Sequence, residues 1–353
     1  MKEFWSSRIR DVTPYVPGEQ PKDRQFIKLN TNENPYPPSP RALAAIQAAA
    51  GDALRLYPDP TCAGRRRAVA DFHGLTPEQV FPGNGSDEIL AFAFQAFFDQ
   101  DPPILFADIT YSFYAVYAQY FGLTPALIPL EADFTLPVAA FTDRPCGGVV
   151  IANPNAPTGL GVELDDLRRV LEANRDVVVL VDEAYVDFGG QTAVPLLADY
   201  ENLLIVRTLS KSRSLAGLRV GYALGSPDLV AGLCCVRDSI NSYTLDRLAQ
   251  AGAAAAMEDR AWFEETRAKV MATRTRAAAR LQAIGFTVLP SQANFLFLSH
   301  PAVPAKALLD GLRAKGVLVR WFDAPRVRDY LRVSVGTDGE MDALCAALEA
   351  LTP

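Results

Sequence analysis

The chain has 353 residues, of which 49% are hydrophobic and 21% charged, and it carries a formal net charge of -7. One hydrophobic core seldom extends over that length, so we expect two lobes. The negative charge and the absence of a basic block argue against nucleic acid or an anionic membrane as a partner, because both are bound through clustered Lys and Arg side chains.

Up to about residue 245, short apolar runs alternate with helical patterns. A Pro- and Asn-rich arm fills the first forty residues, and a helix is expected from Arg41, with Pro40 near its first turn. The predicted strands are 104–107, 148–152, 177–181, 203–207 and 219–224, and the predicted helices include 87–98, 111–121 and 163–174. Apolar strands separated by helices form a mostly parallel sheet covered on both faces. The pattern therefore predicts a three-layer α/β domain.

The character of the chain changes after about residue 245. A long helical segment rich in Ala, Arg and Glu runs to roughly residue 283, and strands are predicted at 286–289, 294–298, 316–320 and 331–335. These elements indicate a smaller α+β domain. We expect a large domain at 41–245 and a second unit made of the arm, 1–40, together with 246–353.

The cysteines and histidines leave little material for a metal site or a disulfide framework. There are five cysteines and two histidines, two of the cysteines are adjacent, and no CxxC pair occurs. We therefore expect no metal. The chain begins without an apolar signal core and has no membrane-length apolar stretch, so we expect a protein of the reducing cytoplasm.

Lys211 and its surroundings carry the strongest chemical signal. This lysine follows an apolar strand and lies in a turn rich in Ser, Gly and Leu, which is a poor context for a surface lysine. Thr208 and Ser210 lie beside it and Arg219 follows, and hydroxyls with a guanidinium suit a phosphate. Asp182 ends the preceding apolar strand, where ligand sites of open α/β sheets lie. A lysine for a Schiff base and a carboxylate for a pyridine nitrogen are the two halves of a pyridoxal phosphate site.

A second anion signal lies at residues 83–88. A strand end, a glycine turn and a helix start follow one another there, and the free N–H groups and dipole of a helix start favour an anion. Ser86 and Asp87 suit that role, although either residue could simply cap the helix. Two tyrosines extend the site, because Tyr185 could reach the 3-oxygen of the ring and Tyr111 could stack on its face.

The remaining motifs are TPYVPG (13–18), KLNTNENPY (28–36), RLYPDP (55–60), NPNAPTG (153–159), VDEAYVDF (181–188) and LRVSVGT (331–337). With these motifs in this order, the chain resembles the class I/II aminotransferase family of fold-type I pyridoxal phosphate enzymes along nearly its whole length. Within that family it is most similar to the branch that acts on histidinol phosphate. The resemblance implies a mostly parallel sheet in the large domain and pyridoxal 5'-phosphate as cofactor.

The resemblance also implies a role for each site residue. Lys211 forms the Schiff base, Asp182 pairs with the pyridine nitrogen, Tyr185 holds the 3-oxygen and Tyr111 stacks on the ring. The implied phosphate ligands are Ser86, Asp87, Thr208, Ser210 and Arg219, joined by Tyr57 of the neighbouring subunit in an obligate homodimer. The implied substrate ligands are Arg332, which binds the anionic group, together with Arg320 and Tyr15.

One position departs from the family pattern. Ala156 stands where the motif usually carries an Asn that donates to the 3-oxygen of the ring. Either Tyr185 holds this oxygen alone, or Asn155 or a water molecule substitutes.

The expected reaction is transamination of L-histidinol phosphate with 2-oxoglutarate, giving imidazole-acetol phosphate and L-glutamate in histidine biosynthesis. Arg320 and Arg332 together offer enough donors for a phosphate in one half-reaction and a carboxylate in the other. Two alternatives stay open, an aromatic amino-acid aminotransferase and a decarboxylase acting on threonine phosphate. A transcription regulator is disfavoured, because the chain starts with the family's own arm and has no spare length for a helix-turn-helix.

Overall fold

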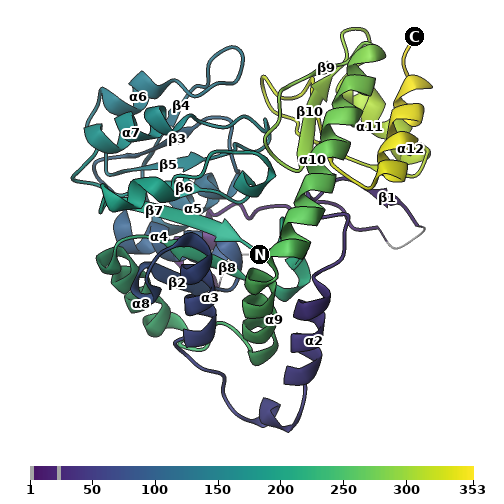
Figure 1. Cartoon of the computed structure of the whole chain (residues 1–353). Coiled ribbons are helices and arrows are strands. Elements are labelled where there is room, and N and C mark those ends of the chain that lie inside the picture. The colour runs from purple at the N-terminus through teal and green to yellow at the C-terminus, as the bar shows by residue number, and fades with distance from the viewer. Residues whose placement is uncertain (1–3, 22–24) are drawn as a thin grey trace.

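A seven-stranded sheet forms the centre of the computed structural model, which describes residues 4–21 and 25–353 (Figure 1). The strand order is β2-β8-β7-β6-β5-β3-β4. Only β8 runs antiparallel to its neighbours, and the other pairs are parallel. The strands are β2 (Val80–Gly83), β3 (Ile104–Ala107), β4 (Pro125–Ile128), β5 (Gly148–Ala152), β6 (Val179–Asp182), β7 (Leu203–Thr208) and β8 (Gly221–Leu224).

Helices cover both faces of this sheet, because its interior strands are apolar on both sides. One face packs on α4 (Gly85–Phe97), α5 (Phe113–Phe121) and α8 (Pro227–Ile240). The other face packs on α3 (Ala63–His73), α6 (Val138–Thr142), α7 (Leu164–Ala173) and α9 (Arg247–Glu258), and α2 (Pro40–Ala49) lies against α9. The predicted three-layer, mostly parallel α/β fold is confirmed.

A smaller sheet lies beside the large one, next to the long helix α10 (Arg260–Ala283), as Figure 1 shows. Its order is β12-β13-β10-β9 and all its pairs are antiparallel. The elements are β9 (Thr287–Val288), β10 (Phe295–Ser299), β12 (Arg320–Trp321), β13 (Leu331–Ser334), α11 (Ala305–Ala314) and α12 (Asp338–Glu349). They enclose a core of their own with α10, as expected for a smaller α+β unit.

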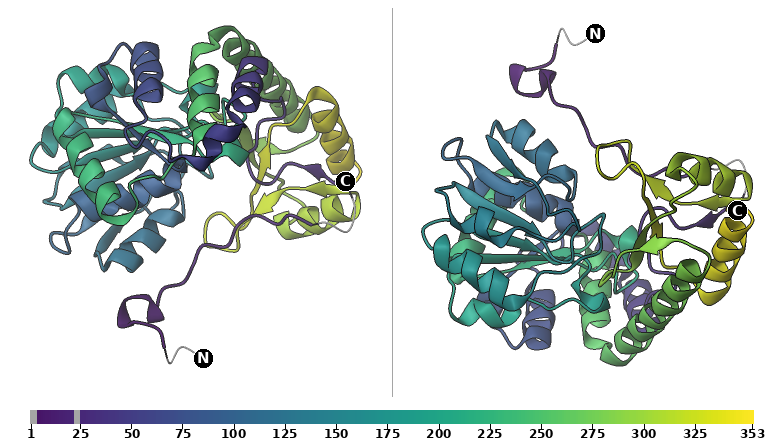
Figure 2. Two further views of the ribbon diagram at one scale, coloured as in Figure 1. Left: turned by 90° about the horizontal axis from the view of Figure 1, so that it is seen from below. Right: turned by 90° about the horizontal axis from the view of Figure 1, so that it is seen from above.

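The start of the chain joins this smaller unit. β1 (Ile27–Lys28) pairs in parallel with β11 (Val317–Leu318). Upstream, α1 (Ser7–Arg10) reaches beyond the two sheets, as both views in Figure 2 show. The backbone N–H of Thr13 donates to Gln119 Oε1 of α5 over 3.1 Å. The arm therefore touches both units, and the domain bounds 41–245 and 1–40 with 246–353 stay a prediction.

Short 3-10 helices complete the chain at η1 (Asp52–Arg55), η2 (Pro77–Gln79), η3 (Val186–Phe188), η4 (Val194–Ala198) and η5 (Ala216–Leu218). One of them shortens a predicted strand. The prediction 219–224 starts too early, because Arg219, the residue after η5, has a left-handed backbone (φ 53°) and β8 begins only at Gly221. Within the described ranges, no helix is long and apolar enough to cross a membrane.

Two predictions in the second half differ from the structure in more than their bounds. The single helical segment is two helices, because the side chain of Asp259 caps a new helix start by accepting from the backbone N–H of Trp262. The predicted strand 316–320 is also divided. Its first part pairs with β1, whereas Arg320 and Trp321 pair with β13 in the four-stranded sheet.

Candidate active site

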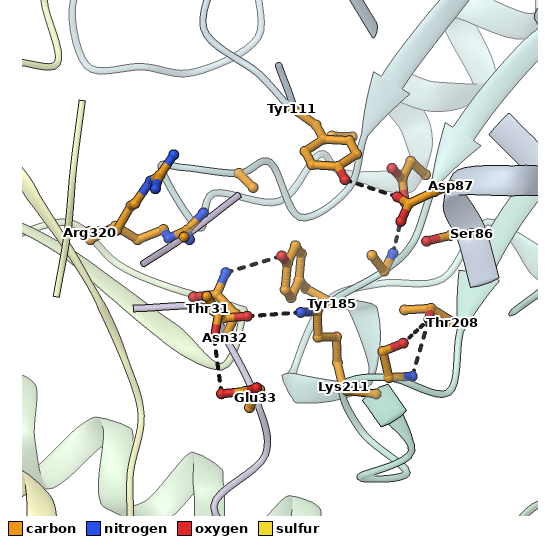
Figure 3. Close-up of a pocket in the computed structure, with 18 of the residues that line it drawn as sticks. Thr31, Asn32, Glu33, Ser86, Asp87, Tyr111, Tyr185, Thr208, Lys211 and Arg320 are labelled. Carbon is orange, nitrogen blue, oxygen red and sulfur yellow. Dashed lines mark hydrogen bonds between the residues drawn. The ribbon is translucent and has the colours of Figure 1, made fainter. Parts of the chain in front are cut away.

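A cavity of about 210 Å³ lies at the carboxyl ends of β6 and β7 (Figure 3). Ligand sites of open α/β sheets occupy this edge. All of the predicted site residues except Asn155 and Tyr57 line it. The predicted residues that line it are Tyr15, Ser86, Asp87, Tyr111, Asp182, Tyr185, Thr208, Ser210, Lys211, Arg219, Arg320 and Arg332, and residues 30–33 of the arm line it as well.

Lys211 lies in the turn that follows β7. Its Nζ donates to the backbone oxygen of Thr31 over 3.1 Å, and the side-chain amide of Asn34 donates to the Lys211 backbone oxygen over 3.0 Å. Burial lowers the pKa of Lys211 to about 8, and the nearby Arg332 guanidinium adds to the effect. A buried amine with this pKa has a larger neutral fraction near neutral pH, which is the form that acts as nucleophile or base.

Asp182 is the last residue of β6 and is only 5% exposed. The hydroxyl of Tyr114 donates to its Oδ2 over 2.7 Å, and the backbone N–H of Ala184 donates to Oδ1 over 3.1 Å. Burial raises the pKa of Asp182 to about 6, although both donors act in the opposite direction. A cation that approaches this carboxyl would therefore lower its pKa and favour the charged carboxylate.

Tyr185 receives a hydrogen bond that the sequence did not indicate. Asn32 Nδ2 donates to Tyr185 Oη over 3.1 Å. The amide of Asn32 is fixed in turn, because its Oδ1 accepts from Ser334 Oγ over 3.0 Å. Burial raises the pKa of Tyr185, so its hydroxyl keeps its proton. Asn32 has a left-handed backbone (φ 56°), a conformation that Asn adopts more readily than most residues and that marks functional positions.

Tyr111 lies on the other side of the cavity. Its hydroxyl donates to Asp87 Oδ1 over 2.9 Å, and Asp87 Oδ2 pairs with Arg219 Nη2 over 3.0 Å (Figure 3). Burial raises the pKa of Tyr111, and the Asp87 carboxylate raises it further. The ring is therefore held in place by its hydroxyl, at the start of α4.

An anion cradle lies at the start of α4. A Cβ added to Gly85 (φ 80°) would stand 2.8 Å from Arg219 Nη2, and one added to Gly221 would stand 2.6 Å from the backbone nitrogen of Ser86. Glycine at position 85 lets the guanidinium approach the helix start, and glycine at position 221 lets the start of β8 pack against it. The hydroxyls of Thr208 and Ser210, 3.0 Å apart, line the same cavity. Helix N–H groups, hydroxyls and a guanidinium are a donor set suited to a phosphate.

Arg320 lies on the opposite side of the cavity from Ser86 and Thr208 (Figure 3), and Arg332 of β13 is its partner across the β12–β13 pair. Arg320 Nη2 donates to the Val16 backbone oxygen and Arg332 Nη2 to the Asn30 backbone oxygen, each over 3.2 Å. The buried Nε of Arg332 has no partner among the described residues. Burial also lowers the pKa of Arg332. Both guanidinium groups keep N–H donors that these bonds do not use. A buried donor without a partner is unfavourable, so an anionic ligand that accepts from Arg332 Nε would stabilise the site.

A second chamber of about 440 Å³ adjoins the first and shares Tyr15, Tyr111, Ala156, Arg320 and Arg332 with it. The rest of its wall is mainly apolar and includes Phe106, Ile109, Leu127, Phe322 and Val327. Tyr15 stacks on Phe113 with ring centres 4.4 Å apart at this junction. A ligand anchored by the arginines therefore has room for a further ring.

The structure does not bring Asn155 or Tyr57 to the cavity. Asn155 Nδ2 donates to the Ile109 backbone oxygen and to Thr158 Oγ1, over 3.0 and 3.1 Å, so it is already used within its own loop. Tyr57 is 78% exposed and stacks on Tyr243 with ring centres 4.5 Å apart. Ala156 lies in the cavity wall and offers no side-chain donor.

Lysine, carboxylate and anion cradle meet at one edge of a mostly parallel sheet, and this combination defines the fold-type I class of enzymes. The chain belongs to the aminotransferase class I and II family, whose model matches residues 24–348. No group of three or more His, Cys, Asp or Glu side chains that could hold a metal ion occurs in the part of the chain that the structure describes.

Among curated relatives, a histidinol-phosphate aminotransferase of Clostridium acetobutylicum is 54% identical, over 97% of each chain. One of Marinomonas sp. (strain MWYL1) is 53% identical, over 99% of this chain and 100% of its own. The solved structure of the Sinorhizobium meliloti histidinol-phosphate aminotransferase, in complex with pyridoxal-5'-phosphate, superposes with a TM-score of 0.83 at 26% identity. It covers 93% of this chain and 91% of its own.

Proposed function

We propose that this chain catalyses the reversible transamination of L-histidinol phosphate with 2-oxoglutarate, giving imidazole-acetol phosphate and L-glutamate, a step of L-histidine biosynthesis. Sequence identity of more than 50% to relatives named histidinol-phosphate aminotransferase, along nearly the whole chain, carries the proposal. The unpartnered Nε of Arg332 beside Arg320 supports it, because one cavity wall must accept a phosphate and then a carboxylate.

The donors around the first chamber fit pyridoxal 5'-phosphate. The start of α4, Ser86, Thr208, Ser210 and Arg219 would hold its phosphate, with Asp87 orienting the guanidinium. The Asp182 carboxylate would pair with the protonated ring nitrogen and accept its hydrogen bond. Tyr111 would lie on the ring face, and the Tyr185 hydroxyl would donate to the 3-oxygen. Because the Asn155 amide is already used, Tyr185 takes that contact alone or with a water molecule.

When bound, pyridoxal phosphate supplies an aldehyde that takes up amines and a ring that accepts electrons. Lys211 Nζ would hold the cofactor through its aldehyde. Once the substrate amine has displaced it, Nζ would be free to move a proton of the substrate. Its pKa of about 8 suits a base that would remove the proton from the amine-bearing carbon of the substrate and hold it for delivery to the cofactor. Arg320, Arg332 and Tyr15 hold the anionic group of the substrate, which fixes that carbon within reach of Nζ.

The test compares substrates on the purified protein supplied with pyridoxal phosphate. We expect kcat/KM with 2-oxoglutarate as acceptor to be highest for histidinol phosphate, without carbon dioxide release. A preference for phenylalanine or tyrosine would replace the proposal with an aromatic amino-acid aminotransferase. Carbon dioxide released from threonine phosphate would replace it with the decarboxylase.

We also propose a homodimer in which Tyr57 reaches the cofactor phosphate of the neighbouring subunit. Leu54, Leu56 and Tyr57 are 54%, 52% and 78% exposed, and such an exposed apolar patch favours a protein partner. Light scattering should give twice the chain mass. Lys211→Ala and Tyr57→Ala should each lose activity alone, and mixing them should restore it, because a mixed dimer contains one intact site. A monomeric or non-complementing protein would overturn this arrangement.

The proposed compartment is the cytoplasm. All five cysteines are free, which is the state that a reducing compartment maintains. Fractionation of the source cells, with activity followed in each fraction, tests this assignment.

A further inference from the structure

A cluster of charged side chains lies behind the cavity, on the other face of the large sheet. Side chains alternate along a strand, so Glu183 and Arg207 point away from the face that Asp182 and Thr208 present to the cavity. Glu183 continues the ladder directly after β6, since its backbone N–H donates to the Val206 backbone oxygen over 2.8 Å. The cluster thus lies beneath both strands that carry the site.

Arg207 is the centre of this cluster. Its Nε lies 2.9 Å from Glu183 Oε2, and its Nη1 lies 3.4 Å from Asp187 Oδ1. The Arg207 and Glu183 side chains are 6% and 0% exposed. A buried guanidinium between two carboxylates is held firmly, because moving any partner leaves a charge without compensation in a low-dielectric interior.

Each carboxylate connects Arg207 to one of the two key site residues, Glu183 to Asp182 and Asp187 to Lys211. Glu183 follows Asp182 directly, and it also accepts hydrogen bonds from Thr192 and Ala193, which hold it in place. Asp187 Oδ2 accepts the hydroxyl of Ser212, the residue that follows Lys211. One guanidinium therefore connects the end of β6 with the lysine turn by a continuous series of polar contacts.

We propose that Arg207 is a positioning residue that fixes the Lys211 turn relative to the end of β6. It contacts neither cavity, so it acts through Glu183 on one side and through Asp187 and Ser212 on the other. Without this link, the amine and the Asp182 carboxylate keep their chemistry but lose their fixed separation. The effect on turnover rests on the proposed function, whereas the link itself is testable in the cofactor-free protein.

The main variant is Arg207→Lys, which keeps the positive charge and loses the planar fork. In the enzyme loaded with pyridoxal phosphate, we expect kcat to fall roughly 10- to 100-fold, since a misplacement of about 1 Å costs about 100-fold. KM for histidinol phosphate should change less than about threefold, because Arg320 and Arg332 are untouched. In the cofactor-free protein, amide hydrogen exchange should accelerate in both 183–188 and 209–214.

A milder variant, Ser212→Ala, removes only the contact between Asp187 and the lysine turn. Exchange should accelerate in 209–214 and stay unchanged in 183–188, and this result remains informative if Arg207→Lys does not fold. The control is Arg276→Lys, which alters exposed ion pairs with Asp338 and Asp342 of 2.8 and 2.7 Å and should leave both segments and kcat unchanged.

Two results would overturn the proposal. One is Arg207→Lys with kcat within about twofold of the parent and unchanged exchange in both segments. The other is a lower kcat with unchanged exchange, which would mean that Arg207 acts by another route. If the parent itself fails to transaminate histidinol phosphate, the proposed function falls, but the exchange measurements still decide whether the link exists.

Discussion

Removing the Tyr114 hydroxyl should raise the pKa of Asp182. Tyr114 is fully buried and donates to Asp182 Oδ2 over 2.7 Å. A hydrogen bond to a charged group contributes about 1.5–3 kcal/mol, and one pKa unit corresponds to about 1.4 kcal/mol, so Tyr114→Phe should raise this pKa by about one to two units. The starting value in the cofactor-free protein is about 6. The carboxyl would then be largely protonated near neutral pH, where it no longer offers a charge to the ring nitrogen.

The assay is the dissociation constant of pyridoxal phosphate from the cofactor-free protein, measured by fluorescence quenching between about pH 5 and pH 9. The acid midpoint of the affinity should move upward by about one to two units in Tyr114→Phe. Tyr200→Phe is the matched control, because it removes another 2.7 Å bond from a buried tyrosine to a carboxylate, that of Glu172, away from the cavity. If the Tyr114→Phe midpoint moves no further than the control, the reasoning is refuted.

Three further variants test the site. The pKa of Asp182 is raised on folding, so its favourable contribution to stability is complete below about pH 4 and is lost as the pH rises through about 6. Asp182→Asn should therefore stabilise the cofactor-free protein at neutral pH by up to about 3 kcal/mol in denaturant unfolding, and a gain that persists near pH 4 would contradict this account. Lys211→Ala should leave a folded protein whose kcat drops by about 10²- to 10⁴-fold or more, and near-normal turnover would refute the assignment of the lysine. Arg320→Ala should raise KM for histidinol phosphate about 10- to 100-fold, equivalent to about 1.5–3 kcal/mol, with a smaller effect on kcat. An unchanged KM in steady-state kinetics would exclude Arg320 from the anion contact.

The interior of the large sheet could be predicted from the sequence because its strands are continuous apolar runs. The predictions 104–107 and 148–152 coincide with β3 and β5. The end of β2 was predicted at the glycine turn that precedes α4. The outer strand β4 was not predicted, because it is partly exposed and its apolar signal is weak. Lys211 and Asp182 could be proposed as partners because strand ends in such sheets meet at one edge.

Residues whose roles depend on distant partners could not be predicted. Asn32 and Tyr185 are 153 positions apart, and nothing in either motif indicates their contact. Tyr114 is an apolar-face residue of α5 in the sequence pattern, and only the fold shows that its hydroxyl reaches Asp182. Arg207 likewise ends an apolar run, so its two carboxylate partners emerge only when the strands are aligned.

The wall beside Lys211 is assembled from segments that lie far apart in the sequence. Thr31, whose backbone oxygen accepts a hydrogen bond from the Lys211 amine, lies shortly after β1. The strand partner of β1 is β11, 290 positions downstream. During synthesis the ribosome releases residues 27 and 211 long before residue 317, and domains generally fold in the order in which they emerge. The lysine turn of a nascent chain therefore lacks its arm until β11 has emerged. Release of β11 from the ribosome and enclosure of the lysine are thus coupled, and a chain that stops before β11 has no finished pocket in which to retain a cofactor.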